Sequence, residues 1–187
     1  MMNHSHRSMF VWFLFIGAMM TLTAGTGWAQ GGDSVVEARA LLATDAVHAN
    51  SPAKMAVVAR VATGYHINDH HPSLDYLIPT ALTLDPSPQV TVNNVAYPKG
   101  TPERLAFSDL PLSVYAGTVI IGAEFEVKRG VAPGAYALKA KLGYQACNDH
   151  ACLPPASVPL ELMLKVVPPS VPLKPMEPEV FRGIRFQ

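Results

Sequence analysis

Two cysteines, Cys147 and Cys152, are the residues of this sequence best suited to covalent chemistry. They are its only cysteines, and four residues separate them in the stretch YQACNDHACLPP. Two cysteines at this spacing can close a disulfide. Such a bond either fixes a structure or exchanges electrons with the thiols of a partner protein. The two interpretations predict different functions.

The segments on both sides of the cysteines have the alternating pattern of β-strands, YALKAKLGYQAC before the loop and SVPLELMLKVV after it. Cys147 would then end one strand of a hairpin and Cys152 begin the return, with residues 148–151 as a polar loop. Residues that face each other across a hairpin have Cβ atoms roughly 4.5–5.5 Å apart, so the pair can bond with little movement. The closed loop is only about six residues long, for which the chain-entropy relation gives about 2 kcal/mol. Such a bond is easily broken by thiolate attack. On these grounds alone, an inert structural disulfide is an equally good interpretation.

The neighbours of the pair have chemical consequences for it. His150 lies inside the loop and would favour a nearby thiolate if protonated, whereas Asp149 beside it would oppose this effect. Both could equally be solvated loop residues. Pro154 and Pro155 cannot donate ladder hydrogen bonds, so they predict a sheet edge. An open edge suits the docking of a partner, although prolines at an edge also serve to block aggregation.

The stretch HINDHH, with His66, Asp69, His70 and His71, is the second cluster of reactive side chains. Imidazoles and a carboxylate this close could bind copper or zinc. No helical spacing makes the rings converge, so we expect a polar loop with no metal. The sequence contains no Ser-His-Asp arrangement or phosphate-binding glycine loop, and we expect no cofactor. The 14 basic and 14 acidic residues balance, which makes nucleic acid a poor candidate for a partner.

The N-terminus predicts export from the cytoplasm. A basic start is followed by an apolar run from Met9 to Met20, about 12 residues long and short of the about 20 that a membrane-spanning helix needs. Small residues follow, with Gly27 and Ala29 where a signal peptidase acts. We predict a cleaved signal peptide over residues 1–29 and a mature periplasmic protein, in a compartment where disulfides persist.

The rest of the chain predicts one all-β domain. Val36–Ala43 and Lys54–Val61 show the alternation of half-buried strands, and further short segments of this kind are separated by turn residues. Together with 17 prolines, this pattern predicts an antiparallel β-sandwich over residues 30–167. Residues 168–187 are proline-rich and are expected to form an extended linker or arm.

The cysteine stretch YQACNDHACLPP…VPLEL resembles the active-site hairpin of the N-terminal periplasmic domain of the thiol:disulfide interchange protein DsbD. ATGYHINDHHPSLDYLIPTALTL and LSVYAGTVII resemble two further segments of that domain, so the similarity extends from about Val36 to Val167. The resemblance implies an immunoglobulin-like sandwich. It also implies a domain that takes electrons from a membrane-embedded donor and passes them to periplasmic disulfide isomerases and cytochrome c maturation proteins.

The resemblance also implies roles for individual residues. Cys152 corresponds to the cysteine that forms the mixed disulfide with partners, and Cys147 to the resolving thiol. Tyr115, in SVYAG, is a candidate for a lid over the sulfurs, although its periodicity alone indicates a core residue.

We therefore predict a periplasmic thiol–disulfide exchange module that acts through Cys147 and Cys152. If the module is an active enzyme, we expect it to resemble a protein-disulfide reductase. Its expected partners are thioredoxin-like proteins or disulfide isomerases. No membrane domain or thioredoxin-like domain follows Val167 in this sequence, so we expect a separate membrane electron donor and leave the direction of electron flow open. We expect a monomer. The main alternative is a non-catalytic immunoglobulin-like binding or assembly module in which the disulfide is only structural. A periplasmic metal-handling protein is the third interpretation.

Overall fold

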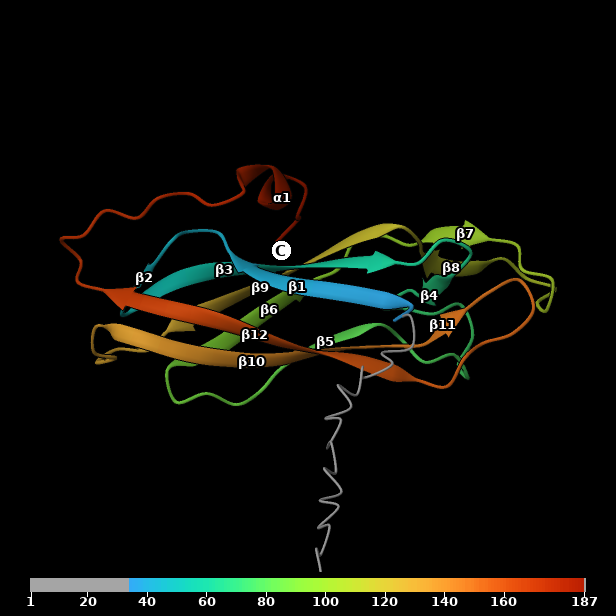
Figure 1. Cartoon of the computed structure of the whole chain (residues 1–187), viewed down its shortest axis with the longest axis horizontal. Helices are drawn as coiled ribbons and strands as arrows, with labels where there is room; N and C mark the ends of the chain where they lie inside the picture. Colours follow the sequence, from blue (N-terminus) through green and yellow to red (C-terminus); the bar gives the residue numbers. More distant parts are fainter. Residues whose placement is uncertain (1–33, 187) are drawn as a thin grey trace, which may run out of the picture. The chain divides into compact units, whose positions relative to one another are not determined.

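The computed structural model describes residues 34–186, so the predicted signal peptide lies outside the described residues. Within them the chain is nearly all β, with twelve strands and one short helix (Figure 1). No helix in this part of the chain has the length and apolar character that a membrane crossing requires. The elements are β1 (Val36–Leu42), β2 (Val47–His48), β3 (Ser51–Val61), β4 (His66–Asn68), β5 (Ala81–Leu84), β6 (Val90–Ala96), β7 (Thr101–Glu103), β8 (Leu112–Tyr115), β9 (Thr118–Val127), β10 (Gly134–Tyr144), β11 (Ala146–Cys147), β12 (Ala156–Val167) and α1 (Pro178–Arg182).

Two four-stranded sheets form an immunoglobulin-like sandwich. One has the order β1-β3-β9-β6 with antiparallel neighbours throughout. The other has the order β2-β12-β10-β5, antiparallel except where the short β2 runs parallel to β12. This arrangement confirms the predicted all-β antiparallel sandwich.

Alternation along the long strands explains the core. Successive side chains of a strand point to opposite faces, so every second residue can be apolar and buried. On β10 the buried residues are Leu138, Ala140, Leu142 and Tyr144, and on β12 they are Leu160, Leu162, Leu164 and Val166. These residues join Ile121 and Phe125 of β9 in one core between the two sheets.

A third, smaller sheet carries the cysteines, with the order β11-β4-β8-β7 (Figure 1). Its inner strand β4 pairs with β11 on one side and β8 on the other. Ala146, Ile67 and Tyr115 lie opposite one another across these three strands, and all three belong to the core. One face of the small sheet is therefore anchored to the sandwich, which positions the other face.

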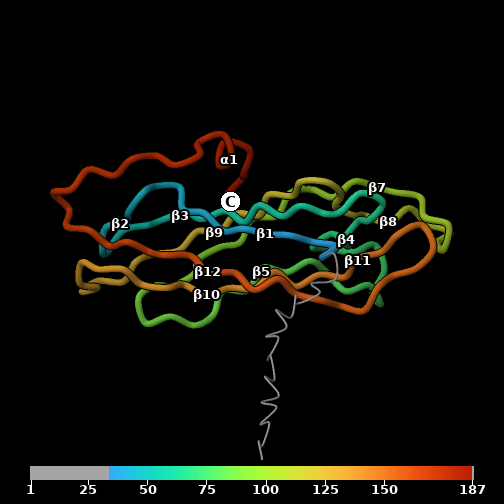
Figure 2. Tube along the Cα trace, viewed as in Figure 1, coloured from blue at the N-terminus to red at the C-terminus, as the bar shows by residue number. Residues whose placement is uncertain are grey.

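The proline-rich segment after β12 returns along the sandwich (Figure 2). The Asp45 amide donates to the Lys174 carbonyl at 3.0 Å, and the Met176 amide donates to the Ala43 carbonyl at 2.9 Å. Glu177 forms an exposed ion pair with Arg39 of β1 at 2.9 Å. The segment is thus an arm attached to the domain along its length, and its short helix α1 was not predicted from the sequence.

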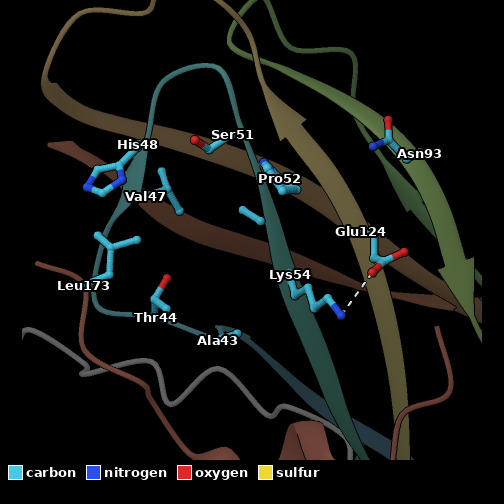
Figure 3. A pocket seen from close by; sticks show the side chains of 11 residues that line it. Ala43, Thr44, Val47, His48, Ser51, Pro52, Lys54, Asn93, Glu124 and Leu173 are labelled. Atoms are coloured by element: carbon cyan, nitrogen blue, oxygen red, sulfur yellow. Dashed lines mark ion pairs between the residues drawn. The ribbon is translucent and has the colours of Figure 1, made fainter. Parts of the chain in front are cut away.

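A cavity of about 340 Å³ lies between β2, β3, β9 and this arm (Figure 3). Lys54 and Glu124 form an ion pair of 3.1 Å on its wall, and Leu173 of the arm lines it. The ring Nε2 of His48 lies 2.9 Å from the Val171 carbonyl, a further link between β2 and the arm. In Figure 1, β2 lies at the opposite end of the sandwich from β11, so this cavity is remote from the cysteines.

Candidate redox site

Cys147 and Cys152 form a disulfide, with an Sγ–Sγ distance of 1.99 Å and a Cα–Cα distance of 3.9 Å. The two residues face each other in an isolated antiparallel bridge, as expected for the predicted hairpin. Cys147, in β11, is fully buried, whereas Cys152 is half-buried. The sulfurs therefore differ in access, and a partner can approach the pair only from the side of Cys152.

Asn148 holds the loop between the cysteines. Its side-chain oxygen accepts hydrogen bonds from the amides of His150 and Ala151, at 2.9 and 3.0 Å. Its own amide donates to the Ala151 carbonyl at 3.0 Å. Asparagine commonly closes tight turns in this way, so its place in the loop was a signal that the sequence interpretation missed. Asp149 and His150, the loop residues that it did single out, are both exposed at the tip.

His66 lies directly opposite Cys147 in the ladder between β4 and β11. It is only 7% exposed, and its Nε2 has no hydrogen-bond partner. Burial lowers the pKa of His66, while the negative charges of Asp149 and Glu103 partly oppose this shift. Burial therefore favours the neutral form of the imidazole. The sequence pattern placed His66 in a polar loop, because the pairing of β4 with the hairpin is a tertiary contact.

Asn68 and Gln145 link the hairpin to the loop of residues 69–80. The Asn68 amide group donates to the Gln145 side-chain oxygen at 3.2 Å and to the Ile78 carbonyl at 2.9 Å. Gln145 in turn donates to the Leu153 carbonyl at 3.3 Å, next to Cys152. These bonds fix the segment on which the more accessible sulfur lies.

Tyr115 is on the other face of the small sheet. It shares a row with Ile67 and Ala146, and Cys147, the next residue along β11, points the opposite way. Its hydroxyl donates to Asp69 Oδ1 at 2.6 Å. Burial and this hydrogen bond raise the pKa of Tyr115. A role as a lid over the sulfurs therefore remains a prediction from the resemblance.

Asp69 is a structural acceptor. Besides Tyr115, it accepts hydrogen bonds from the Ser113 hydroxyl at 2.7 Å and from the amides of Gly100 and His71 at 3.2 and 3.3 Å. Burial raises the pKa of Asp69, but these hydrogen bonds together hold it below its usual value. All of these donors come from the chain itself, so they occupy the carboxylate that the sequence pattern offered as a metal ligand.

The two remaining histidines of HINDHH have other contacts. His70 stacks on Tyr97 with ring centroids 3.6 Å apart, and its Nδ1 lies 2.9 Å from the Thr80 carbonyl. The ring of His71 contacts that of His70 edge-on. Within residues 34–186, no group of three or more His, Cys, Asp or Glu residues is arranged to hold a metal ion.

Apolar side chains are exposed on two loops, residues 69–80 and 104–111. These loops follow β4 and β7, which lie at the same end of the sandwich as β11 (Figure 1). Tyr76 and Leu110 are 71% and 59% exposed, and Ile78 and Phe107 are also exposed. Exposed apolar residues that gather at one end of a domain commonly mark an interaction surface. The sequence pattern did not identify them, since exposure depends on how the loops fold.

The chain is similar to known proteins in sequence and in fold. Residues 34–162 match the family described as the N-terminal part of the thiol:disulfide interchange protein DsbD. The N-terminal periplasmic domain of ScsB from Proteus mirabilis aligns with a TM-score of 0.50 and 15% identity, over 69% of this chain and 46% of that one. The complex of the DsbD N-terminal and PilB N-terminal domains from Neisseria meningitidis aligns with a TM-score of 0.39 and 19% identity, over 66% and 80%. No curated protein matches the sequence. At 15% identity the likeness to the ScsB domain shows the fold alone, and the chain spans less than half of the ScsB chain.

Proposed function

Since the chain belongs to the family of DsbD N-terminal domains, we propose that it is a periplasmic thiol–disulfide exchange module, which passes two electrons through Cys147 and Cys152 to or from partner proteins. The observation that carries this proposal is the disulfide itself. It lies on an edge hairpin, with one buried and one accessible sulfur. This is an arrangement that a two-step exchange requires.

In the reducing direction, the thiolate of Cys152 attacks a disulfide of the partner. A mixed disulfide forms, and one partner sulfur leaves with the electron pair. Cys147 then attacks the Cys152 sulfur, which closes the intramolecular disulfide and releases the partner as a dithiol. Burial of Cys147 keeps it from reacting with the partner directly, so it serves as the resolving thiol. Atoms and electrons balance with two protons taken up by the partner.

We propose that the partner docks on the exposed apolar residues of the cysteine end, which include Tyr76 and Leu110. This partner would be a thioredoxin-like protein or a disulfide isomerase. The resemblance also implies partners that act in cytochrome c maturation. Electrons would reach the pair from a membrane donor. The chemistry uses sulfur alone and involves no cofactor.

A second candidate function is a binding or assembly module with a fixed disulfide. The complete burial of Cys147 and the two hydrogen bonds to the Asn148 oxygen favour it, because both would also suit a static hairpin.

The experiment that separates the two is a determination of the redox state of the pair in intact cells. Rapid acid quenching followed by alkylation should trap a substantial reduced fraction of an exchange module. That fraction should rise when the oxidising enzymes of the compartment are removed. A pair that is fully oxidised under all conditions, and that reduced thioredoxin-like proteins fail to reduce in solution, would support the structural disulfide.

A further inference from the structure

His66, Cys147 and Cys152 form one row across β4, β11 and the returning segment of the hairpin. His66 faces Cys147 in the β4–β11 ladder, and Cys147 faces Cys152 in the bridge that closes the hairpin. Directly opposite residues of antiparallel strands project their side chains from the same face, with Cβ atoms roughly 4.5–5.5 Å apart. The imidazole therefore lies next to the disulfide, on the face of the small sheet that is turned away from Tyr115.

On this face, buried polar atoms lack hydrogen-bond partners. Among residues 34–186, two buried side-chain polar atoms are without a hydrogen-bond partner, His66 Nε2 and Asn68 Oδ1. Both belong to β4 and are two residues apart, so they project from the same face. Buried polar atoms are nearly always satisfied, and each exception calls for an explanation. An orphaned nitrogen beside a disulfide is explained if the other redox state supplies its partner.

We propose that His66 is the proton acceptor of the Cys147 thiol in the reduced protein, an inference that rests on the proposed exchange function. A disulfide sulfur has no hydrogen to donate, so Nε2 is unsatisfied in the oxidised state. Reduction places a proton on the Cys147 sulfur, and in the tautomer with its hydrogen on Nδ1 the neutral ring can accept a hydrogen bond from this thiol at Nε2. His66 therefore favours the reduced state of the pair.

The same contact serves the resolving step. The proton of the Cys147 thiol moves to Nε2, and the resulting thiolate attacks the Cys152 sulfur of the mixed disulfide. The bond between Cys152 and the partner sulfur breaks, its electron pair leaves with that sulfur, and the imidazolium returns the proton to it. One disulfide has formed within the chain and one thiol on the partner, so the step needs no further reactant.

The charges around His66 fit a group that gains and loses a proton. Asp149 from the hairpin loop and Glu103 from β7 place negative charge near the ring, and both favour the imidazolium form. Burial favours the neutral form and is the larger effect, so the pKa of His66 is lowered and the resting ring can accept a proton. His150 is exposed on the same loop and provides a matched control.

The test is a redox titration of the purified chain in dithiothreitol and glutathione buffers between pH 5 and 9. It compares the unchanged protein with His66→Phe, His66→Gln and His150→Gln. His66→Phe should shift the equilibrium toward the disulfide by about fivefold, the equivalent of one hydrogen bond. His66→Gln keeps an acceptor but cannot take the proton, so its equilibrium between dithiol and disulfide should stay close to that of the unchanged protein. It should also slow alkylation of Cys147 near neutral pH in a Cys152→Ala background. His150→Gln should change neither quantity.

Equal shifts in His66→Phe and His66→Gln, with unchanged alkylation, would reduce His66 to a packing residue and overturn the proposal, as would no shift in either variant. If His66→Phe fails to fold, the alkylation rate of Cys147 in the His66→Gln variant still decides. Because the titration uses small thiols, it can succeed even if no protein partner exchanges with the pair. Conversely, the redox state in cells can show exchange while His66 proves inert.

Discussion

Cys147 and Cys152 face each other in one bridge, yet the first is fully buried and the second keeps part of its surface open. The difference follows from their surroundings. Cys147 lies on β11, which is paired to β4, whereas Cys152 is followed after Leu153 by Pro154 and Pro155, which cannot donate ladder hydrogen bonds. Two chemically equivalent sulfurs thus become unequal through the strands that carry them.

This inequality predicts the order of attack. Cys147→Ala should accumulate mixed disulfides through Cys152, because no resolving thiol remains to release them. Cys152→Ala should trap few or none, since its remaining thiol is buried. Both variants should stay folded, because losing a disulfide with so short a loop costs about 2 kcal/mol.

Mass spectrometry of complexes captured from periplasmic extracts measures the trapping, and the Cys147→Ala/Cys152→Ala double variant is the background control. Equal trapping by both single variants would show that the assigned order is wrong.

The hydrogen bonds of Asn148 make a separate prediction about the loop. Asn148→Ala removes one acceptor from two loop amides, His150 and Ala151, and should destabilise the hairpin by about 1 kcal/mol. Asp149→Ala, at the adjacent exposed position, is the matched control and should change stability little. Urea unfolding of the oxidised proteins measures both changes. Indistinguishable midpoints for the two variants would contradict the role given to Asn148.

The sandwich and the hairpin could be predicted from the sequence because both depend on local patterns. Alternation in β10 and β12 buries Leu142 and Leu164, and the loop between two strands brings Cys147 to Cys152. The family resemblance extended this to a function. These features are encoded within a few consecutive residues, so a single sequence suffices to read them.

The environment of the cysteines could not be obtained in that way. His66 comes next to Cys147 only because β4 pairs with β11, and these strands are separated by nearly half of the chain. HINDHH looked like one polar cluster, yet the strand ends within it. His66 therefore faces the hairpin, while His70 stacks on Tyr97. Strand boundaries and long-range register are set by tertiary packing, which local composition does not encode.

The arm gives a third prediction, through Gly122 of β9. A Cβ at this position would overlap Ile184 and Phe186 of the arm, so Gly122→Ala should displace the end of the arm. Lys54, whose ammonium lies 4.3 Å from the centre of the Phe186 ring, would lose that contact. We expect faster limited proteolysis after α1.

Gly143→Ala is the matched control, because a Cβ there would meet its nearest neighbour, the Ala81 carbonyl, at an ordinary 3.7 Å. Equal protection of the arm in both variants would indicate that the fit at Gly122 does not hold it.

The final prediction concerns acid stability and the bond between Tyr115 and Asp69. The folded protein holds the pKa of Asp69 below its value in the unfolded chain, because hydrogen bonds outweigh burial. As pH falls, the unfolded state therefore binds this proton first. The contribution of Asp69 is complete above the unfolded value of about 3.9 and is lost as pH falls through the lower, folded value.

Tyr115→Phe removes the shortest of the hydrogen bonds to Asp69 and raises the folded pKa toward the unfolded one. This variant should be less stable at pH 7, and its stability should fall less steeply between about pH 5 and pH 2, the range over which a depressed carboxyl pKa acts. Tyr136→Phe also loses a hydroxyl hydrogen bond, to the Ala132 carbonyl in an exposed turn, and should keep the steep acid dependence. Urea midpoints measured across this pH range distinguish the variants. If Tyr115→Phe keeps the full acid dependence, the hydroxyl does not hold the charge of Asp69.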